Sequence, residues 1–494
     1  MWSKTLLTTF FFWFLSSSVH ANFVMDPNSI NAYNAIMDLR FADARKLIQD
    51  ERTKEPNNGI TILLEDYMDY LHLTLNNNKA DYDKLLDRRS DRLDALEDND
   101  KNSPWYLFSQ AEVYMHWGVL KSQYGDYISS MRDLNKARKL LTENNQKFKD
   151  FTPNKKSLAW TELLFGAIPS NVRGVASMFG LKGNIDSGYR KLEAFKSEIV
   201  GSKYSFYNDE LIFLIGLINV DVLKSKNNYD RLMAMSNEMN DKSLLKKYLQ
   251  GYISFKMGHA TEAINYFSAA PQTAAYMQLP IISYWLGNAK LCRMDKDADD
   301  HFQKFLTENK GSSYIKETYL KLAYHSLLQN DVNGYNNYIK LVRSKGAAND
   351  EKDKQALKEA NDSRPDIALL KARFYFDGGY YSKALDLLKD QQVTELKLIR
   401  DKIEYYYRLG RTYDRTNNVA EALANYDKAI AIGRTSTYYY AANAAVNSGV
   451  LYEQKKDSKK AAEYFNAALQ MKNHEYQNSI DTQAKEGLAR VKGD

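Results

Sequence analysis

The sequence predicts an all-α protein, a right-handed solenoid of stacked helical hairpins with one apolar insertion that does not fit the repetition. The chain has 494 residues, of which 44% are apolar and 26% charged, a composition that can bury a core and therefore excludes disorder. Only 8 prolines and 23 glycines occur, which favours long uninterrupted helices. Small and aromatic residues recur in a fixed pattern, as in stacked repeats. At about 100 to 200 residues per domain, this length corresponds to roughly two to four domains.

Residues 1–21 have the pattern of a signal peptide. Lys4 supplies a positive charge, an apolar run follows from Leu6 to Leu15, and Val19-His20-Ala21 places small residues where a signal peptidase cleaves. The run is shorter than the about 20 residues of a membrane span, and an uncleaved N-terminal anchor is the alternative. We therefore expect export to the periplasm or cell envelope, with cleavage after Ala21. The single cysteine, Cys292, excludes an intramolecular disulfide and any multi-cysteine metal site.

Residues 366–494 form the clearest block of repeats. Two segments share one pattern of small and aromatic residues: Gly410, Tyr413, Ala422 and Tyr426 in the first, and Gly449, Tyr452, Ala461 and Phe465 in the second. This pattern resembles the tetratricopeptide repeat, which implies two helices per repeat that form a hairpin. Small residues let the helices of one hairpin approach closely, and the tyrosines fill the space between hairpins. A repeat cannot bury its apolar face alone, so further copies are expected.

Further copies of the pattern extend the repetition toward the N-terminus. Gly251, Ala263 and Phe267 form a copy in a central block, residues 231–343, and Ala372, Ala384 and Leu388 form another in the C-terminal block. Weaker echoes lie at 284–302, at 319–339 and at Ala32, Ala44 and Ile48. We expect residues 22–230 to be an N-terminal helical block with degenerate hairpins. Residues 344–365 are polar and of mixed charge and cannot bury a face, which predicts an exposed helical linker or an elongated hairpin between two repeat blocks.

Residues 158–188 are apolar, contain five glycines and fit no repeat. They hold an aliphatic helix, a Gly-x-x-Pro step and a short apolar segment that ends Phe-Gly-Leu-Lys-Gly. This arrangement resembles the signature region of the Iml2 and TTC39 group of tetratricopeptide proteins, and the residues that carry it are Phe165, Gly166, Ile168, Pro169, Phe179, Gly180, Gly183 and Gly188. The group is best known in eukaryotic cells, so the resemblance implies a shared architecture and not a shared cellular task. We expect the glycines to permit tight turns and close helix contact.

Known catalytic and metal-binding motifs do not occur in the sequence. The closest two of the 7 histidines, His301 and His325, are too far apart for a His-x-x-x-His zinc helix. The acidic run from Asp295 to Asp300 begins like a calcium loop but lacks the turn glycine and the closing glutamate. The glycine-rich stretch lacks the lysine and spacing of a phosphate-binding loop, and no Gly-x-Ser-x-Gly elbow is present. We therefore expect no enzyme activity and no cofactor or metal.

The first helix of each stacked hairpin is expected to line a concave groove. Counted from the small residue of each repeat, the candidate groove residues are Tyr248, Tyr252, Phe255, Arg373, Phe376, Tyr407, Arg411 and Arg415. Aromatic residues and arginines dominate binding hot spots because they combine large rigid area with directional hydrogen bonds. Arg411 and Arg415 lie one helical turn apart and can present two guanidinium groups to one acidic or carbonyl-rich peptide segment. The alternative is that these are partly exposed helix residues without a partner.

The sequence thus predicts a non-enzymatic scaffold that binds a protein or peptide in this groove. Nucleic acid is not expected as a partner, because the formal net charge of +6 is spread along the chain and the protein is exported. The alternative function is a membrane-surface module, in which the 158–188 segment lies in the lipid interface with Arg173 and Lys182 flanking Val172, Val175, Met178 and Phe179. In the other interpretation, that segment is a hairpin that covers the core.

Overall fold

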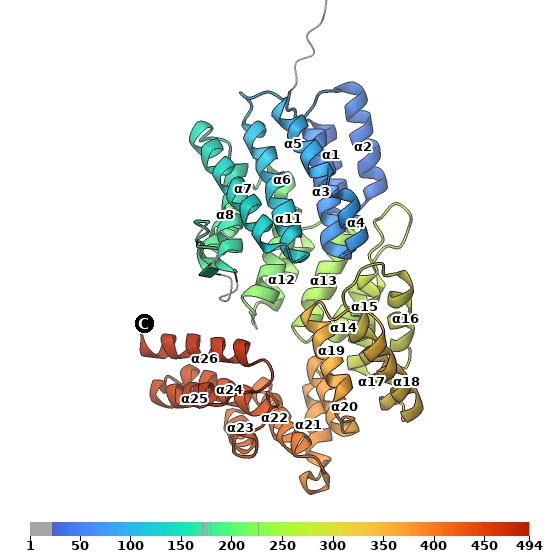
Figure 1. Cartoon of the computed structure of the whole chain (residues 1–494), viewed down its shortest axis with the longest axis vertical. Coiled ribbons are helices and arrows are strands. Elements are labelled where there is room, and N and C mark those ends of the chain that lie inside the picture. The colour runs from blue at the N-terminus through green and yellow to red at the C-terminus, as the bar shows by residue number, and fades with distance from the viewer. Residues whose placement is uncertain (1–21, 169–172, 175, 178, 226, 494) are drawn as a thin grey trace, which may run out of the picture. The chain divides into compact units, whose positions relative to one another are not determined.

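The computed structural model describes residues 22–168, 173–174, 176–177, 179–225 and 227–493. Over these residues the chain is helical, with a single isolated β-bridge between Asn22 and Asn58 and no β-strand (Figure 1). The expected all-α solenoid of helical hairpins is confirmed. The signal peptide expected at residues 1–21 lies outside the described residues, and so do Pro169, Val172, Val175 and Met178 of the apolar segment.

The chain divides into two compact units. Unit 1 comprises the described residues up to Thr74 together with Ala80–Asn208, and unit 2 comprises Leu75–Lys79 and the residues from Asp209 onward. This division differs in detail from the sequence-based blocks, because the central and C-terminal repeats form one continuous unit.

Helices of unit 1 pair into hairpins. Its elements are α1 (Pro27–Met37), α2 (Phe41–Lys54), α3 (Ile60–Asn76), whose last residues belong to unit 2, α4 (Lys79–Leu85), α5 (Arg88–Glu97), α6 (Pro104–Gln123), α7 (Tyr127–Lys147), α8 (Pro153–Gly166), α10 (Ile185–Glu198) and the 3-10 turn η1 (Ser205–Tyr207). Side-chain caps start several helices: Asp26 accepts a hydrogen bond from the Ser29 N–H, and a proline follows at the first helical position. The hairpins α1/α2, α6/α7 and α8/α10 are in close contact.

Glycines allow two of these hairpins to close. A Cβ atom on Gly118 of α6 would lie 2.8 Å from Cγ of Leu134 in α7. Cβ atoms on Gly166 and Gly188 would lie 2.6 Å from the Ile185 nitrogen and 2.8 Å from the Ala159 oxygen. Real Cβ atoms do not approach backbone atoms so closely, so α8 and α10 could not pack in this way with larger residues. Close helix contact is therefore what the glycines of the 158–188 segment provide at these positions.

Unit 2 continues the hairpins to the C-terminus (Figure 1). Its elements are α11 (Asn208–Leu217), the π-helical turn η2 (Ile218–Val222), α12 (Tyr229–Asn237), α13 (Leu244–Lys256), α14 (Ala260–Ser268), α15 (Ile281–Arg293), α16 (Ala298–Glu308), α17 (Ile315–Leu328), α18 (Val332–Ser344), α19 (Glu351–Asn361), α20 (Ile367–Asp377), α21 (Tyr381–Asp390), the 3-10 turn η3 (Val393–Glu395), α22 (Ile399–Arg415), α23 (Val419–Gly433), α24 (Tyr440–Gln454), α25 (Ser458–Gln470) and α26 (Gln477–Lys492). Consecutive helices from α13 to α18 and from α20 to α25 form antiparallel pairs that stack on their neighbours.

Four hairpins of unit 2, α13/α14, α15/α16, α22/α23 and α24/α25, close on a glycine of the first helix and an aromatic ring of the second. A Cβ atom on Gly251, Gly410 or Gly449 would lie 2.5 to 2.6 Å from the ring of Phe267, Tyr426 or Phe465, respectively. The three rings are fully buried, and so are Ala263, Ala422 and Ala461 beside them. Gly287 and Phe302 repeat this contact in α15/α16, where the sequence shows only a weak echo. Tyr413 and Tyr452 are only half-buried, so these two positions contribute less to the core than the pattern suggests.

The 344–365 stretch is not wholly exposed, and that part of the sequence-based expectation is wrong. It contains α19, which packs against α17 and α18 and buries Ala356 and Ala360. Side chains as small as alanine suffice because the helix lies close to its neighbours and because polar groups complete its contacts.

The α13/α14 and α20/α21 hairpins are distant in sequence but contact each other. The turn after α13 touches the turn after α20: the Ala260 N–H donates to the Gly378 oxygen at 3.2 Å, and the hydroxyl groups of Thr261 and Tyr380 lie 2.8 Å apart. Gly379 has a φ of +84° and leaves no room for a Cβ beside the Gly258 backbone. Helix α20 also packs on α15. The helices α17 to α19 are therefore inserted in sequence between parts of the chain that contact each other.

Candidate partner-binding surface

The first helices of the C-terminal hairpins lie side by side. Helix α22 contacts α20 on one flank and α24 on the other. We call the face formed by α20, α22 and α24 the first-helix surface, and it carries five of the eight candidate groove residues: Arg373, Phe376, Tyr407, Arg411 and Arg415. The structure therefore brings these five residues of the predicted set together.

Arg411 and Arg415 are the two arginines of this surface that lack an ion pair. The Nη1 of Arg411 donates to the Tyr407 hydroxyl at 3.1 Å, and its guanidinium carbon lies 4.5 Å from the centre of the Phe376 ring. The Nε of Arg415 donates to the Tyr381 hydroxyl at 3.0 Å, and its guanidinium carbon lies 5.4 Å from that ring. Both side chains are half-buried, and no carboxylate of the described residues lies within ion-pair distance. Each guanidinium thus keeps most of its donors open to a ligand.

Neighbouring arginines are neutralised within the chain. The Nη1 of Arg373 lies 3.1 Å from a Glu359 oxygen, the Nε of Arg408 donates to Glu404 at 2.6 Å, and Arg400 pairs with Asp401 at 2.8 Å. Burial alone would raise the pKa of Glu359, but the charge of Arg373 and the hydroxyl of Tyr324 outweigh it and lower the pKa to about 2. This contrast singles out Arg411 and Arg415 as the positions with charge available to a partner.

Tyr407 holds the Arg411 side chain in place through a hydrogen bond. Its ring is fully buried, and its hydroxyl accepts a hydrogen bond from Nδ2 of Asn443 in α24 at 2.7 Å as well as the one from Arg411. The ring also packs edge-on against Tyr439. Tyr407 is therefore a positioning residue that holds Arg411 between α22 and α24, whereas the sequence alone suggested that it contacts the partner. Asn443 was missed because the pattern assigns no role to that position.

The remaining three candidates, Tyr248, Tyr252 and Phe255, form a separate aromatic cluster on α13. The rings of Tyr248 and Tyr252 are stacked 5.8 Å apart, and Trp285 of α15 lies 5.2 Å from Tyr252 and 5.5 Å from Phe255. The Tyr252 hydroxyl donates to Asp221 of the π-helical turn at 2.8 Å. Since Tyr248 and Tyr252 are only 9% and 8% exposed, their rings pack between helices and offer little area to a ligand.

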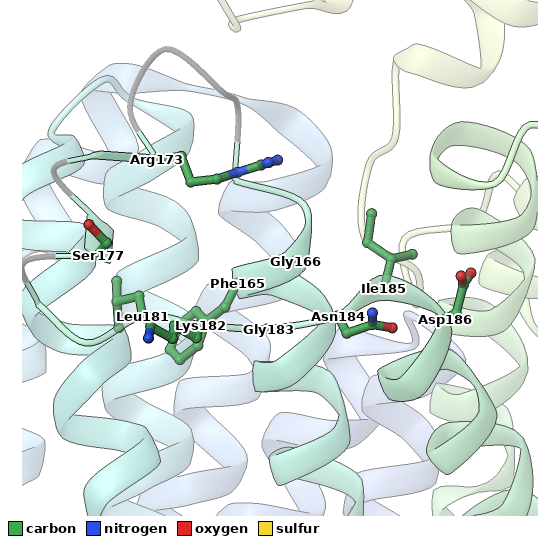
Figure 2. A pocket seen from close by; sticks show the side chains of 10 residues that line it. All are labelled: Phe165, Gly166, Arg173, Ser177, Leu181, Lys182, Gly183, Asn184, Ile185 and Asp186. Carbon is green, nitrogen blue, oxygen red and sulfur yellow. The ribbon is translucent and has the colours of Figure 1, made fainter. Parts of the chain in front are cut away.

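One pocket, with a volume of about 510 Å³, lies beside the glycine-rich segment of unit 1 (Figure 2). Its lining residues are Phe165, Gly166, Arg173, Ser177, Leu181, Lys182, Gly183, Asn184, Ile185 and Asp186. Figure 2 shows Arg173 and Ser177 on one side and Ile185 and Asp186, at the start of α10, on the other. The Arg173 guanidinium donates to the Ile168 oxygen at 3.2 Å, and Asn184 caps α10 by accepting from the Ser187 N–H. The Arg173 guanidinium and the Asn184 side chain thus each form a hydrogen bond with a nearby backbone group.

Reactive chemistry has little support in the described residues. No group of three or more His, Cys, Asp or Glu side chains in this part of the chain is placed to hold a metal ion. Cys292 is buried, and burial raises the pKa of its thiol, which disfavours the nucleophilic thiolate. None of the helices described combines the length and the apolar character of a membrane span.

Stacked antiparallel hairpins define a helical-repeat protein of the solenoid class. Residues 403–433 and 442–475, which correspond to α22/α23 and α24/α25, match the family model described as Tetratricopeptide repeat. These two hairpins are therefore tetratricopeptide repeats, in agreement with the resemblance seen in the sequence. No curated protein matches the chain.

Three of the solved structures that match this chain are 12 to 13% identical to it. The P58(IPK) TPR domain is 13% identical, with 86% of this chain and 97% of that chain covered and a TM-score of 0.22. Yeast Tom70 is 13% identical, with 94% and 96% covered and a TM-score of 0.28. The human IFIT1 dimer, solved with m7Gppp-AAAA, is 12% identical, with 96% of each chain covered and a TM-score of 0.32. Similarity at this level carries no information about a ligand.

Proposed function

We propose that this protein is a non-enzymatic scaffold that binds an acidic or carbonyl-rich segment of another protein on its first-helix surface. The observation that carries the proposal is the pair Arg411 and Arg415, two half-buried guanidinium groups one helical turn apart without an ion pair. A buried charge is costly unless it is paired, and a partner carboxylate or carbonyl would supply the missing acceptors. Tetratricopeptide hairpins offer a rigid face for such contacts.

The location and ancestry of the protein are part of the same proposal. The signal-peptide pattern of residues 1–21 indicates export, so the partner would be an exported or envelope protein. N-terminal sequencing of the protein recovered from its own cells should give Asn22 as the first residue, and an intact Met1 would contradict export. The local resemblance of residues 158–188 to the Iml2 and TTC39 group supports a common helical architecture and no particular partner.

Removing both guanidinium groups tests the binding surface. We expect Arg411→Gln with Arg415→Gln to lower crosslinked capture of partners from envelope extract at least tenfold. Folding should change by no more than about 2 kcal/mol per residue, the scale of a desolvated cation–π contact. The single variant Arg411→Lys should retain part of the binding, because lysine keeps the charge but not the planar fork of donors.

Arg434→Gln is the matched control, since it removes an arginine at the end of α23 whose hydrogen bond, to Gln470, is exposed. Its capture should equal that of the wild type. If the double variant instead recovers the same proteins in the same amounts, the first-helix surface is not the binding site, and the 158–188 segment becomes the next surface to test.

A further inference from the structure

Helix α19 differs in composition from the helices that build the hairpins. Its sequence, EKDKQALKEAN, buries only Asp353, Ala356 and Ala360, whereas α22 alone buries ten residues of its 17. Burial of two alanine side chains yields little hydrophobic stabilisation, because that term scales with the apolar area removed from water. The flanking segments are mostly exposed. Polar contacts must therefore supply most of what holds α19 in place.

The N-terminal half of α19 is seated on α17. The Glu317 backbone N–H, in the first turn of α17, donates to Oδ1 of Asp353 at 2.9 Å. The second oxygen of Asp353 is buried without a hydrogen-bond partner, and so are single oxygens of Asp350 and Glu317. Three carboxyl groups with incomplete hydrogen bonding make this seat weaker than an apolar one.

The C-terminal half of α19 and the residue after it contact the first-helix surface and the segment before α26. Glu359 accepts from Arg373 of α20 at 3.1 Å and from the Tyr324 hydroxyl. Lys358 pairs with Glu475, just before α26, at 3.0 Å. Asp362, directly after α19, pairs with Arg400 at the start of α22 and accepts from the Tyr438 hydroxyl, each at 3.2 Å.

These contacts lie on the same set of helices as the proposed binding surface. Arg373 is a candidate groove residue, and Arg400 stands on α22, the helix that carries Arg411 and Arg415. Glu359 and Asp362 supply two of these arginines with carboxylates of the kind that Arg411 and Arg415 lack. The helix thus makes, within the chain, the interactions expected of an acidic partner.

We infer that α19 is an internal ligand of a seat formed by α17, α18 and the adjoining arginines of the first-helix surface, Arg373 and Arg400, and that a partner helix of the same chemistry displaces it. The inference rests on the proposed function and names the partner: a helix with small residues four apart, as at Ala356 and Ala360, and carboxylates at the positions of Glu359 and Asp362. A tethered helix competes at an effective concentration in the millimolar range, so it sets a threshold that only a better-matched partner exceeds. Because α19 buries only two alanine side chains of its own, its exchange exposes little apolar surface of that helix.

A labelled peptide of residues 349–363 of this chain is the probe. Fluorescence anisotropy with the full chain measures its binding to the wild type and to Ala356→Glu with Ala360→Glu, which unseats the tethered helix. We expect the unseated variant to bind the peptide at least tenfold more tightly than the wild type does. Lys354→Glu with Asn361→Glu, on the exposed side of α19, is the matched control and should bind like the wild type. A peptide with Glu359→Gln should lose most of the gain.

Equal binding of the peptide to the unseated variant and the wild type would overturn the inference. Hydrogen exchange on the unmodified protein gives a second measurement that needs no variant: amides of α19 should exchange at least tenfold faster than those of α18 and α20. Equal protection of the three helices would mean that α19 is a fixed structural element. The arginine substitutions at 411 and 415 test the proposed function separately. If they abolish partner capture but the peptide binds the wild type and the unseated variant equally, the proposed function stands and only the displacement of α19 is wrong.

Discussion

The C-terminal hairpins and the centre of unit 1 are held together by different physics. In α22 to α25 each hairpin closes on an apolar contact, Gly410 against Tyr426 and Gly449 against Phe465, and the rings are fully buried. In unit 1, by contrast, α3, α6 and α8 meet at a buried ionic network. Glu112 accepts from Lys156 at 3.0 Å, from Ser157 at 2.5 Å and from the Tyr67 hydroxyl, with Glu112 and Lys156 at most 1% exposed.

A second buried charge adjoins that network. Asp66 lies 2.7 Å from Nδ1 of His116, accepts from the Trp117 indole at 2.9 Å and pairs with Arg92 at 3.1 Å. Burial alone would raise the pKa values of Asp66 and Glu112, but their partners, chiefly His116 and Lys156, outweigh it and lower both. Buried ion pairs add little net stability but become costly when one partner is lost, so unit 1 should be the more sensitive to single substitutions.

The largest effect is expected from breaking the network at Lys156. Lys156→Met leaves the Glu112 carboxylate buried without its counter-charge and should cost unit 1 about 3 to 5 kcal/mol. Urea unfolding followed by hydrogen exchange of α3, α6 and α8 measures this, since a chain of two units need not unfold in one step. Glu112→Gln with Lys156→Met removes both charges and should recover most of the loss. Equal stability of the single and double variants would show that the charges are not coupled.

The same contrast explains what the sequence could predict. The hairpin pattern depends on residue size at fixed spacing within one repeat, so the sequence singles out Gly410, Ala422 and Tyr426. It places Tyr426 between hairpins, however, whereas the structure packs the Tyr426 ring against Gly410 within one hairpin. The same spacing joins Gly118 and Leu134 in α6/α7, but it was overlooked because neither an aromatic residue nor a Leu-Gly pair marks it. The Glu112–Lys156 pair joins helices with no periodic relation, so only the tertiary structure brings these residues together.

The candidate site could be predicted in part for the same reason. The repeat register places Arg411 and Arg415 on one helix and Phe376 on the first helix of the preceding hairpin. In the structure the Arg411 guanidinium lies over the Phe376 ring. Register does not show which arginine finds a carboxylate inside the chain. Arg373 forms an ion pair with Glu359 of α19, a helix that belongs to no repeat. The Tyr252 hydroxyl donates a hydrogen bond to Asp221 of a π-helical turn.

Tyr426 tests the apolar side of the comparison. Tyr426→Ala removes a ring that is fully buried against Gly410 and should cost roughly 3 to 4 kcal/mol, since cavity and transfer terms add. Tyr413→Ala, at a half-buried position of the same repeat, should cost less than half as much. Urea midpoints of the two variants give the ratio. Similar losses at both sites would mean that the exposed area of Tyr413 is a poor guide to its packing.

A substitution at Gly410 tests the contact with Tyr426 from the side of α22. Gly410→Ala places a Cβ 2.5 Å from the Tyr426 ring, and overpacking of this kind costs about 1 to 3 kcal/mol. Alanine also stabilises a helix interior by about 0.5 to 1 kcal/mol relative to glycine, so a net loss of up to about 2.5 kcal/mol is expected. Gly174→Ala is the control, because a Cβ there meets no atom within 4 Å. A variant at 410 as stable as that control would indicate that the ring shifts freely.

The last prediction concerns the polar seat of α19 and its dependence on pH. Burial raises the pKa of Asp353 to about 7, and the nearby carboxyl groups of Asp350 and Glu317 add to the shift, while the Glu317 N–H opposes it. Lys321 and Lys352, the cations close to this seat, lie 3.6 and 3.8 Å from Glu317. The ordinary pKa of an aspartate is about 3.9. The folded protein therefore binds a proton here that the unfolded chain has released.

The sign of the pH dependence follows from that difference. Stability contributed by Asp353 is complete below about pH 4, falls as pH rises toward 7, by at most about 1.4 kcal/mol per pH unit, and is constant above. Asp353→Asn keeps the acceptor for the Glu317 N–H and supplies a donor to Asp350, so it imitates the protonated acid at every pH. The difference in urea midpoint between variant and wild type should consequently grow from pH 5 to pH 7 and then level off. A difference that stays constant over this range would mean that Asp353 is ionised in the folded protein throughout, and that the seat of α19 is held by its hydrogen bonds alone.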